Sequence, residues 1–452
     1  MAKPIRYTDI KNEILKYIDT KSVKPGERLP SIRFFASRLK SSKTTVMRAY
    51  KALEDDHQVY AIQNSGYYYI GKTNQEREHG KQIINFRLAV PEKKLMPYKS
   101  FEHSIKRAVE VYKGDLFTYG KSEGLRELKL ALRKHLMKRQ VYTDVEKIHI
   151  TSGGQQALYL LLNVLKSSEK RIAIVEEPTY SGLLRLIERS NFKCIGVKRT
   201  HDGLDLKELE NLFQTGQVCF FYTVPNYHNP LGSSLTSSQK QAVLKLAQTY
   251  NVEIIEDDYL GDLNLDPKNF PLHYYDTQDR VIYISSFSKS FMPGIRIGMM
   301  VLPKRFKQIY LLEKHACDIC TSVLAQGGLQ LFIDSGMYEN HIKKVRARYT
   351  EKMNRLRKYR DILCSFGVKV YVPHTGIFVW MELPIGMNAH HLENQLYEKN
   401  IHVYSGRHFF INSISQKNAI RLCLANVSIE DLDQGLMGIV HEIKSTMSSL
   451  PV

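Results

Sequence analysis

The sequence has few cysteines and no long apolar run. Of its six cysteines, only Cys317 and Cys320 have a C-x-x-C spacing, with no second pair or histidine partner. We therefore expect buried or half-buried thiols and no metal site. No apolar stretch approaches the roughly 20 residues that cross a bilayer, and charged residues stand where a signal peptide would have its apolar segment. These absences predict a soluble, cytoplasmic protein that does not contact a membrane.

Acidic residues are also in short supply. The chain holds 46 Asp and Glu against 65 Lys and Arg, a net charge of +19, which favours polyanionic partners electrostatically. The basic excess is densest in residues 1–72, with 14 basic against 7 acidic side chains. Charge alone is equally compatible with a solvated basic surface. A length of 452 residues exceeds what one hydrophobic core serves and predicts two or more domains.

The first 70 residues predict three helices and a hairpin. Three runs have helical spacing of apolar residues, and a serine that can cap the helix precedes the second and the third: residues 10–18, 32–39 and 43–55. Two β-prone segments, 59–62 and 67–70, then flank a turn-rich joint. This arrangement predicts a winged helix-turn-helix domain over residues 1–72.

A polar stretch at residues 73–83 predicts an exposed linker before a second domain at 84–452. In this second domain β-rich apolar runs alternate with helical patterns, which predicts an α/β fold with a mostly parallel sheet and helices on both faces. These runs are 147–151, 172–176, 218–223, 252–256 and 281–285. From about Ser365 onward, shorter strands predict a small C-terminal α+β subdomain.

The third helical run has the composition of a recognition helix. A helix-turn-helix places the N-terminal turn of its second helix in the major groove, where small polar and basic side chains reach bases and phosphates. The side chains expected to face DNA on this run and at its start are Ser42, Lys43, Thr44, Thr45 and Arg48.

The stretches KPGERLPSIR (24–33), SKTTV (42–46) and AYKAL (49–53) closely resemble the GntR winged-helix family. The resemblance implies that Arg33 and Lys43 contact double-stranded promoter DNA, and that the wing around Ser65 and Gly66 approaches the minor groove. The family commonly has Arg where Lys43 stands. Because lysine cannot make the bidentate fork to guanine, the base read there stays open.

A second group of motifs suits a phosphorylated aldehyde. A lysine that forms a Schiff base must offer a neutral amine in a partly desolvated, positively charged neighbourhood, and Lys289 lies among serines with Arg296 nearby. The stretch SGGQQA at 152–157 joins a strand to a helix and predicts an anion site at the helix N-terminus. Asp257 ends a strand, where ligands of open α/β sheets collect and where a carboxylate keeps a pyridine nitrogen protonated.

The order of these motifs, together with PTY (178–180) and NYHNPLG (226–232), resembles fold-type I aminotransferases. With the GntR-like domain in front, the chain resembles the MocR/GabR subfamily of regulators. The resemblance implies pyridoxal 5'-phosphate (PLP) as cofactor, with Lys289 as the Schiff-base lysine and Asp257 at the pyridinium nitrogen. It implies that Asn229 and Tyr259 bond the phenolic oxygen and that Tyr180 stacks on the ring.

The remaining roles implied by this resemblance concern the phosphate, an effector and a second subunit. The residues implied to hold the phosphate are Gly154, Gln155, Ser286, Ser288 and Arg296. Arg421 matches the arginine that binds a substrate carboxylate and would bind a small amino compound. Tyr119 matches a residue that completes the site of the neighbouring subunit, which implies a homodimer.

The sequence supports a DNA-binding transcriptional regulator in which PLP, alone or as an external aldimine with an amino compound, modulates promoter binding. A rival interpretation is an active aminotransferase that carries an accessory DNA-binding domain. A third is a regulator whose second domain binds no cofactor. The intact winged helix favours the first. The effector, the operator and the sign of regulation are not indicated by the sequence.

Overall fold

The computed structural model describes residues 5–56, 58–62, 65–70, 83–411 and 418–448. The chain divides into two compact units, residues 1–81 and 82–452, which we call the head and the body and describe separately. The linker expected at residues 73–83 lies, apart from Ile83, outside the described residues.

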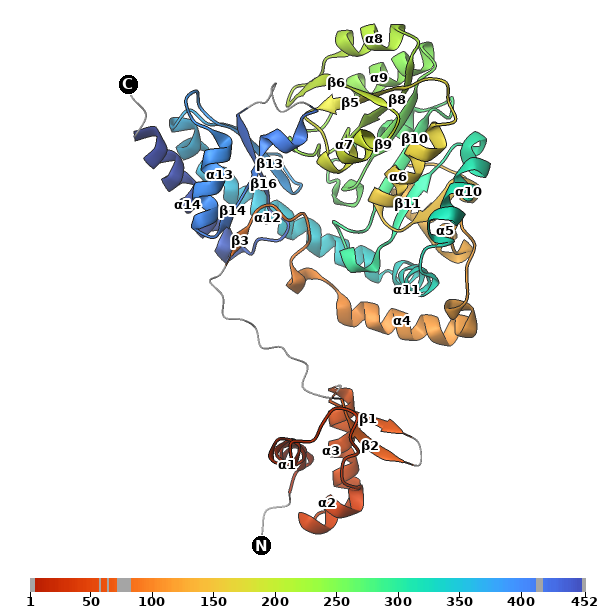
Figure 1. Cartoon of the computed structure of the whole chain (residues 1–452), viewed down its shortest axis with the longest axis vertical. Coiled ribbons are helices and arrows are strands. Elements are labelled where there is room, and N and C mark those ends of the chain that lie inside the picture. Colours follow the sequence, from red (N-terminus) through yellow and green to blue (C-terminus); the bar gives the residue numbers. More distant parts are fainter. Residues whose placement is uncertain (1–4, 57, 63–64, 71–82, 412–417, 449–452) are drawn as a thin grey trace. The chain divides into compact units, whose positions relative to one another are not determined.

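The head consists of three helices and a two-stranded hairpin (Figure 1). The helices are α1 (Tyr7–Thr20), α2 (Ile32–Arg38) and α3 (Lys43–Asp55). The antiparallel strands β1 (Val59–Ile62) and β2 (Gly66–Tyr69) form the wing. Each predicted element of this unit is present, which confirms the winged helix-turn-helix fold.

An apolar stripe holds the head together. Ile10, Ile14 and Ile18, spaced four residues apart on α1, are buried against α3, as expected for side chains on one face of a helix. At the start of α3, the Ser42 hydroxyl accepts a hydrogen bond from the Thr45 amide at 3.1 Å, and so satisfies one of the amides that a helix N-terminus leaves free.

The body is built on an eight-stranded sheet in the order β4-β11-β10-β9-β8-β5-β6-β7. The five strands from β10 to β6 in that order are mutually parallel, whereas β11 and β7 run antiparallel to their neighbours. The mostly parallel sheet is thereby confirmed. The strands are β4 (Ile148–Thr151), β5 (Ile172–Glu177), β6 (Lys193–Thr200), β7 (Gly203–Leu204), β8 (Val218–Thr223), β9 (Glu253–Asp257), β10 (Val281–Ser286) and β11 (Gly298–Val301).

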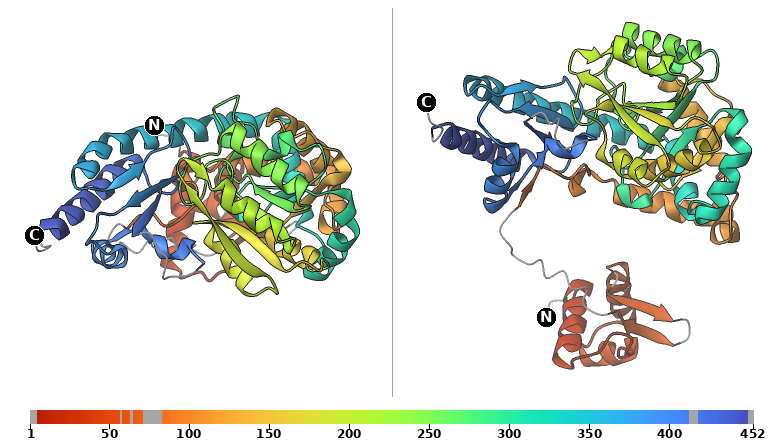
Figure 2. Two further views of the ribbon diagram at one scale, coloured as in Figure 1. Left: turned by 90° about the horizontal axis from the view of Figure 1, so that it is seen from above. Right: turned by 45° about the horizontal axis from the view of Figure 1, so that its top comes forward.

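Helices cover both faces of this sheet (Figures 1 and 2). Because successive strand residues point to opposite faces, Ala173 and Val175 pack with α6, α7 and α10, whereas Ile174 packs with α8 and α9. The helices are α4 (Tyr98–Tyr112), α5 (Arg126–Lys138), α6 (Gly154–Leu165), α7 (Ser181–Glu188), α8 (Leu206–Gln214), α9 (Ser237–Thr249), α10 (Lys307–Asp318) and α11 (Val323–Asp334).

The long helix α12 (Met337–Ser365) leads into the small C-terminal subdomain. Its four-stranded sheet has the order β12-β13-β16-β15, and a separate parallel pair joins β14 to β3, which precedes the large sheet in sequence. The remaining elements are β3 (Ile84–Asn85), β12 (Lys369–Tyr371), β13 (Phe378–Glu382), β14 (Ile401–His402), β15 (Tyr404–Ser405), β16 (Ala419–Cys423), α13 (Ala389–Glu398) and α14 (Ile429–Ser448).

Two predictions from the sequence, on membrane-spanning helices and on the burial of Cys317 and Cys320, can be compared with the fold. Within the described ranges no single helix is long and apolar enough to span a membrane, although the bent pair Lys304–Asp318 and Val323–Asp334 satisfies length and composition jointly. The prediction of buried or half-buried thiols holds for Cys320, which is half-buried, but is wrong for Cys317, which is exposed. Cys317 lies in the last turn of α10, where the helix ends at the surface.

Candidate functional site

One cavity of about 360 Å³ lies at the carboxyl ends of the central parallel strands. It is lined by Lys289 and Arg421 together with the other nine residues assigned to the cofactor from the same chain: Gly154, Gln155, Tyr180, Asn229, Asp257, Tyr259, Ser286, Ser288 and Arg296. Segments far apart in the sequence therefore meet in one pocket. Its volume is in the range of small-molecule sites.

The pocket also contains residues that the sequence did not single out: Ala89, Val90, Leu158, Tyr222, Val224, Pro293 and Phe378. Tyr222 could have been found, because it stands near the carboxyl end of the buried parallel strand β8, the position that already singled out Asp257 on β9. Ala89 and Val90 carry no motif or charge that marks them.

An anion-binding end is formed where β4 meets α6. Gly153 precedes the helix with φ 92°, a conformation that favours glycine, and a Cβ at this position would lie 2.8 Å from the Arg296 guanidinium. Arg296 donates to the Ser152 carbonyl at 2.9 Å. Ser286 and Ser288 stand on the same side of the cavity, their hydroxyls 3.2 Å apart. Free amides at a helix N-terminus, two hydroxyls and a guanidinium suit a phosphate.

Asp257 is the acidic end of the pocket. Its carboxylate accepts a hydrogen bond from the Tyr222 hydroxyl at 2.8 Å, and burial raises its pKa to about 6. No ion pair between described residues includes Asp257. The positive charge of Lys289, which also lines the cavity, lowers the pKa of Asp257 and so opposes part of the rise. A buried carboxylate without an ion-pair partner favours a cationic ring nitrogen beside it.

Lys289 reaches into the pocket from the loop after β10. Its Nζ donates a hydrogen bond to the Ala89 carbonyl at 2.7 Å. Burial lowers the pKa of this amine, and the positive charges of Arg421 and Arg296 lower it further. The lysine therefore gives up its proton more readily than a surface lysine and can supply the neutral amine that Schiff-base chemistry requires.

Three further side chains surround the space between Lys289 and Asp257. The Asn229 side-chain oxygen is buried and has no hydrogen-bond partner among the described residues. Tyr259 donates its hydroxyl to the Tyr227 carbonyl at 2.6 Å, so its expected bond to a phenolic oxygen requires the hydroxyl to turn. The Tyr180 hydroxyl donates to the Gln155 side chain at 2.8 Å. The unpartnered amide of Asn229 is consistent with a polar ligand in this space.

Arg421 closes the opposite side of the pocket. It is buried, donates one bond to the Arg87 carbonyl at 2.7 Å and leaves its Nε without a partner. Its guanidinium lies over the ring of Phe378 at 4.5 Å. Burial lowers its pKa, and no carboxylate in the described parts of the chain forms an ion pair with it. A buried guanidinium that contacts only a carbonyl and aromatic rings is suited to bind the carboxylate of a ligand.

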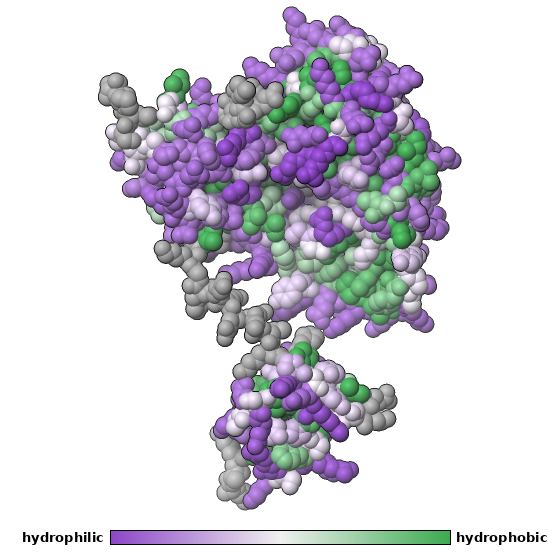
Figure 3. Space-filling view, viewed as in Figure 1, coloured by the Kyte–Doolittle hydropathy of each residue, from purple (hydrophilic) through white to green (hydrophobic). Residues whose placement is uncertain are grey.

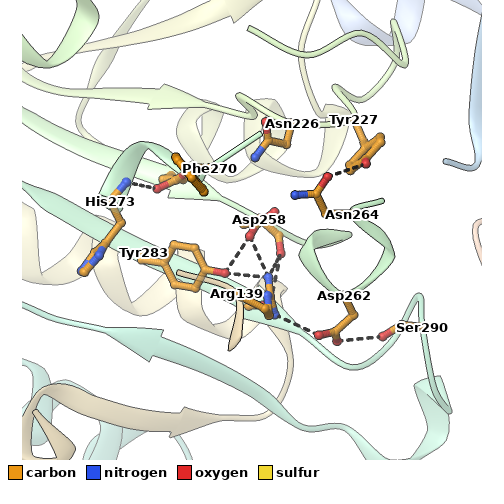
Figure 4. Close-up of polar contacts among 12 residues, drawn as sticks. Arg139, Asn226, Tyr227, Asp258, Asp262, Asn264, Phe270, His273, Tyr283 and Ser290 are labelled. Carbon is orange, nitrogen blue, oxygen red and sulfur yellow. Dashed lines mark hydrogen bonds and ion pairs between the residues drawn. The ribbon is translucent and has the colours of Figure 1, made fainter. Parts of the chain in front are cut away.

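A buried network behind the pocket fixes the loops that carry Asp257 and Lys289 (Figure 4). Arg139, at the end of α5, donates to the Asp258 carboxylate at 2.7 Å and the Tyr283 hydroxyl at 2.6 Å, and it also pairs with Asp262 at 3.4 Å. Asp262 accepts from the hydroxyls of Tyr338 and Ser290. Each neighbour of a pocket residue, Asp258 beside Asp257 and Ser290 beside Lys289, is thus tied to Arg139 directly or through Asp262.

A second buried network supports the loop of Asn229. Glu176 pairs with His228 at 3.1 Å and with Arg199 at 3.3 Å, and all three side chains are fully buried. Burial would raise the pKa of Glu176, but these two partners bring it below its usual value. The loop that carries Asn229 is therefore held by the contact of its neighbour His228 with the buried Glu176 carboxylate, not by contacts at the surface.

Tyr119 does not lie in the pocket of its own chain. Its side chain is 83% exposed and lines a separate surface hollow with Lys121, Glu123 and Arg126. It is therefore available to another molecule, as the resemblance implied for a neighbouring subunit.

The candidate DNA-reading residues lie on the surface of the head. Lys43, Thr44 and Arg48 are exposed on α3, Arg33 is exposed on α2, and Thr45 is half-buried. A surface hollow between α1 and α3 is lined by Arg6, Tyr7, Thr8, Thr44, Thr45 and Arg48.

Two contacts of the head were not anticipated. The Arg48 guanidinium lies over the Tyr7 ring at 4.8 Å, which orients it within the hollow between α1 and α3. At the wing, Gly66 has φ 121° and a Cβ there would lie 3.3 Å from the Arg28 side chain. Arg28 therefore packs against the start of β2, and Gly66 leaves the room for it.

Comparison with known proteins divides the chain at the same place. Residues 86–439 match the family described as aminotransferase class I and II, and residues 6–68 match the bacterial regulatory proteins of the gntR family. A Bacillus subtilis (strain 168) protein named uncharacterized HTH-type transcriptional regulator YcxD is 37% identical over 440 residues, covering 95% of this chain and 98% of that protein.

Aminotransferases are similar at lower identity and over a smaller share of the chain. Aromatic-amino-acid aminotransferase 1 of Thermococcus litoralis is 27% identical over 373 residues, which are 81% of this chain and 89% of that enzyme. The crystal structure of Pyrococcus horikoshii kynurenine aminotransferase, in complex with PMP, superposes with a TM-score of 0.73 at 28% identity, covering 80% of this chain and 91% of that chain.

Proposed function

The chain belongs to the aminotransferase class I and II family and carries a gntR-family DNA-binding domain in front of it, and from this premise we propose that it is a PLP-dependent transcriptional regulator. The proposal rests on two features of one chain. A winged helix presents basic side chains at its surface, and a separate unit holds a lysine, an acid and an anion site in one pocket.

The pocket fits PLP at each end of that molecule. The α6 N-terminus with Ser286, Ser288 and Arg296 would hold the phosphate, Asp257 would face the ring nitrogen, and Lys289 would bond the aldehyde. PLP supplies an electron-withdrawing ring that stabilises negative charge on a carbon bonded to the substrate nitrogen. Asn229, with its unpartnered amide oxygen, and Tyr259 would orient the ring, and Tyr180 would stack on it.

We further propose that a small amino compound with a carboxylate is the effector. Arg421 lines the pocket, is buried and has no ion-pair partner among the described residues, and a carboxylate would satisfy it. A ligand alters DNA affinity only to the extent that it binds two arrangements of the protein differently. Binding in this pocket would therefore bias how the head engages promoter DNA.

A homodimer is proposed from the surface of the body. Figure 3 shows apolar side chains gathered on the body in the region of α4 and α11. In the sequence at and after α4, the large side chains of Tyr98, Phe117 and Tyr119 are 62%, 65% and 83% exposed. Apolar patches of this kind mark protein–protein contacts, and two-fold pairing would bring Tyr119 of each chain to its partner.

The test is cofactor binding followed by DNA binding. Purified protein supplied with PLP should develop a near-visible absorption band, and Lys289→Ala should lose it, because no other lysine lines the pocket described here. Lys268→Ala, which removes an exposed lysine of the same unit, is the matched control and should keep the band. Affinity for a duplex from its own upstream region should then differ with and without PLP and amino acids. Unchanged affinity under every ligand would contradict the regulatory role.

The second candidate function is a working aminotransferase. It is favoured by the completeness of the pocket, in which all the residues assigned to the cofactor from one chain are present. Multiple-turnover assays over a panel of amino donors distinguish the two: rapid, selective turnover would favour the enzyme, and a single turnover or none would favour the regulator.

A further inference from the structure

Residues 84–90 follow Ile83, the first described residue of the body, so any change transmitted along the chain to the head passes through them. We call them the entry segment. It begins as β3, which pairs in parallel with β14 of the small subdomain. The Ile84 and Phe86 amides donate to the carbonyls of Asn400 at 2.9 Å and His402 at 2.8 Å.

The first half of the entry segment is fastened to the small subdomain. The Phe86 carbonyl accepts from the Cys423 amide at 2.8 Å, and the Phe86 ring is fully buried. It packs so closely on α14 that a Cβ at Gly435 would lie 2.6 Å from it. This half of the segment is therefore fastened to the subdomain by main-chain hydrogen bonds and by the Phe86 ring.

The second half crosses the pocket and is held by pocket side chains. Arg421 donates to the Arg87 carbonyl at 2.7 Å, and Lys289 donates to the Ala89 carbonyl at 2.7 Å. Ala89 and Val90 line the cavity itself. Among the described residues, the main chain of 88–90 makes no hydrogen bond other than the one from Lys289.

These two donors are the side chains that ligands would engage. When the Lys289 amine forms a C=N bond to an aldehyde, the aldehyde oxygen leaves as water with two hydrogens, and the lysine nitrogen keeps at most one. That nitrogen is then turned toward its new partner and no longer free to hold Ala89. A carboxylate at Arg421 likewise competes with the neutral Arg87 carbonyl, because hydrogen bonds between ionised partners are stronger.

We propose that the entry segment reads the state of the pocket: the Arg87 and Ala89 carbonyls are bound by Arg421 and Lys289 in the free protein and released when these side chains engage ligands. This inference rests on the proposed function and adds the route of regulation. Without these two anchors β3 separates more readily from β14, which changes the anchoring of the chain that leads to the head, so that pocket occupancy and DNA affinity become linked.

Hydrogen exchange of the full chain, followed by mass spectrometry, measures release through the Ile84 and Phe86 amides, which are bonded to the β14 region and exchange when β3 separates from it. In wild type, addition of PLP should speed exchange of a peptide covering the entry segment by roughly tenfold, the scale expected for loss of one hydrogen bond from a charged donor. In Lys289→Ala the same peptide should exchange fast from the start and not respond to PLP. Unchanged or slower exchange in wild type, although the absorption band shows PLP bound, would overturn the proposal.

A reversible disulfide between β3 and β14 tests whether release of the entry segment is what changes DNA affinity. Asn85 and His402 are paired across β3 and β14, between the pocket and the head, so Asn85→Cys with His402→Cys would join the two strands by a disulfide. With PLP bound as shown by absorbance, the oxidised protein should lose the effect of PLP on DNA affinity, about fivefold or more in wild type, and regain it on reduction. Asn85→Cys alone is the matched control.

The outcomes distinguish this inference from the proposed function. If the locked protein responds to PLP as the wild type does, the entry segment is not the route, while PLP-dependent regulation stands. If PLP does not change DNA affinity in wild type but the segment still exchanges faster, release is supported and the regulatory role fails. If no absorption band forms and exchange is unchanged, both fail.

Discussion

The candidate functional side chains of the head and of the body are held in opposite environments. In the head, Lys43 and Arg48 lie exposed on α3, over a core of apolar residues. In the body, Asp257 and Arg421 are buried, and burial shifts the pKa of each toward its neutral form. The charged side chains of the head are therefore solvated and open to a partner. The charged side chains of the body are buried, where they can bind a ligand that enters the pocket.

This difference determines what else each unit has to contain. Exposed charges need only a stable helix beneath them, and the head supplies it with serine caps and an isoleucine stripe. Buried charges cost free energy unless they are paired, and the loops that carry them must be held in place. The networks around Arg139 and Glu176 in the body perform this second task.

Arg139→Met tests the comparison with the largest expected effect. Removal of one partner from a buried ion pair leaves the other charge uncompensated, so we expect the free energy of unfolding of the body to fall by about 3–5 kcal/mol. Urea unfolding followed by tryptophan fluorescence measures the body alone, because Trp380 is the only tryptophan and is buried there.

The matched change in the head is Lys11→Met, which breaks the ion pair of Lys11 with Asp56. This pair is partly exposed, so we expect a loss of at most about 1 kcal/mol, measured by circular dichroism or by the heat stability of DNA binding. Equal losses in the two units would contradict the contrast between them.

Asp257→Asn tests whether the pocket carboxylate opposes folding. A carboxyl whose pKa is raised from 3.8 to about 6 in the folded protein binds protons more tightly when folded, so stability falls as pH rises between these values and stays low above them. In PLP-free protein the substitution should therefore raise the free energy of unfolding by about 3 kcal/mol at pH 8, and by about half as much at pH 5.

The control for Asp257→Asn is Asp361→Asn, which changes an exposed carboxyl of the same unit and should alter stability by less than about 0.5 kcal/mol at either pH. A stabilisation by Asp257→Asn that does not depend on pH would show that its cause is not the ionisation of the carboxyl.

The contrast also explains how much the sequence predicts. In the head, the candidate DNA contacts on α3 lie within one helix, and helical spacing with Ser42 as cap defines that helix locally. In the body, the parallel strands follow from their apolar runs, but β6 was not anticipated because charged residues interrupt it. The apolar pattern of this strand is masked by Lys193 and Lys198, which are exposed, and by Arg199, which is buried and paired with Glu176.

The pocket was predicted because of motifs, not because of local patterns. Lys289 and Asp257 stand in recognisable sequences at strand ends, whereas Arg139 lies at the end of a surface helix and nothing nearby in sequence marks it as part of a buried network. Ala89 contributes a main-chain carbonyl, which every residue has. Contacts made by distant segments through common groups therefore require the structure.

Lys43→Ala tests whether an exposed lysine of the head contributes to DNA binding without affecting the body. Loss of one direct base or phosphate contact should weaken binding to specific DNA by about 1–3 kcal/mol, which corresponds to roughly 5- to 150-fold. Lys16→Ala removes an exposed lysine from α1 and should change affinity far less. Both variants should keep the PLP absorption band of the wild type, and loss of the band in Lys43→Ala would show that the two units depend on each other for folding. Fluorescence anisotropy with a labelled duplex provides the measurement.

Ser42→Ala and Ser31→Ala have the smallest expected effects and divide structure from contact within the head itself. Both serines cap helices: the Ser42 hydroxyl accepts from the Thr45 amide at 3.1 Å, and the Ser31 hydroxyl from the Phe34 amide at 3.2 Å. Each substitution should cost about 1 kcal/mol of head stability. Only Ser42 stands at the start of α3 among the candidate DNA contacts, so only Ser42→Ala should also weaken DNA binding at a temperature where both variants are fully folded. Equal affinities would assign Ser42 to capping alone and leave Lys43, Thr44, Thr45 and Arg48 as the candidate contacts on α3.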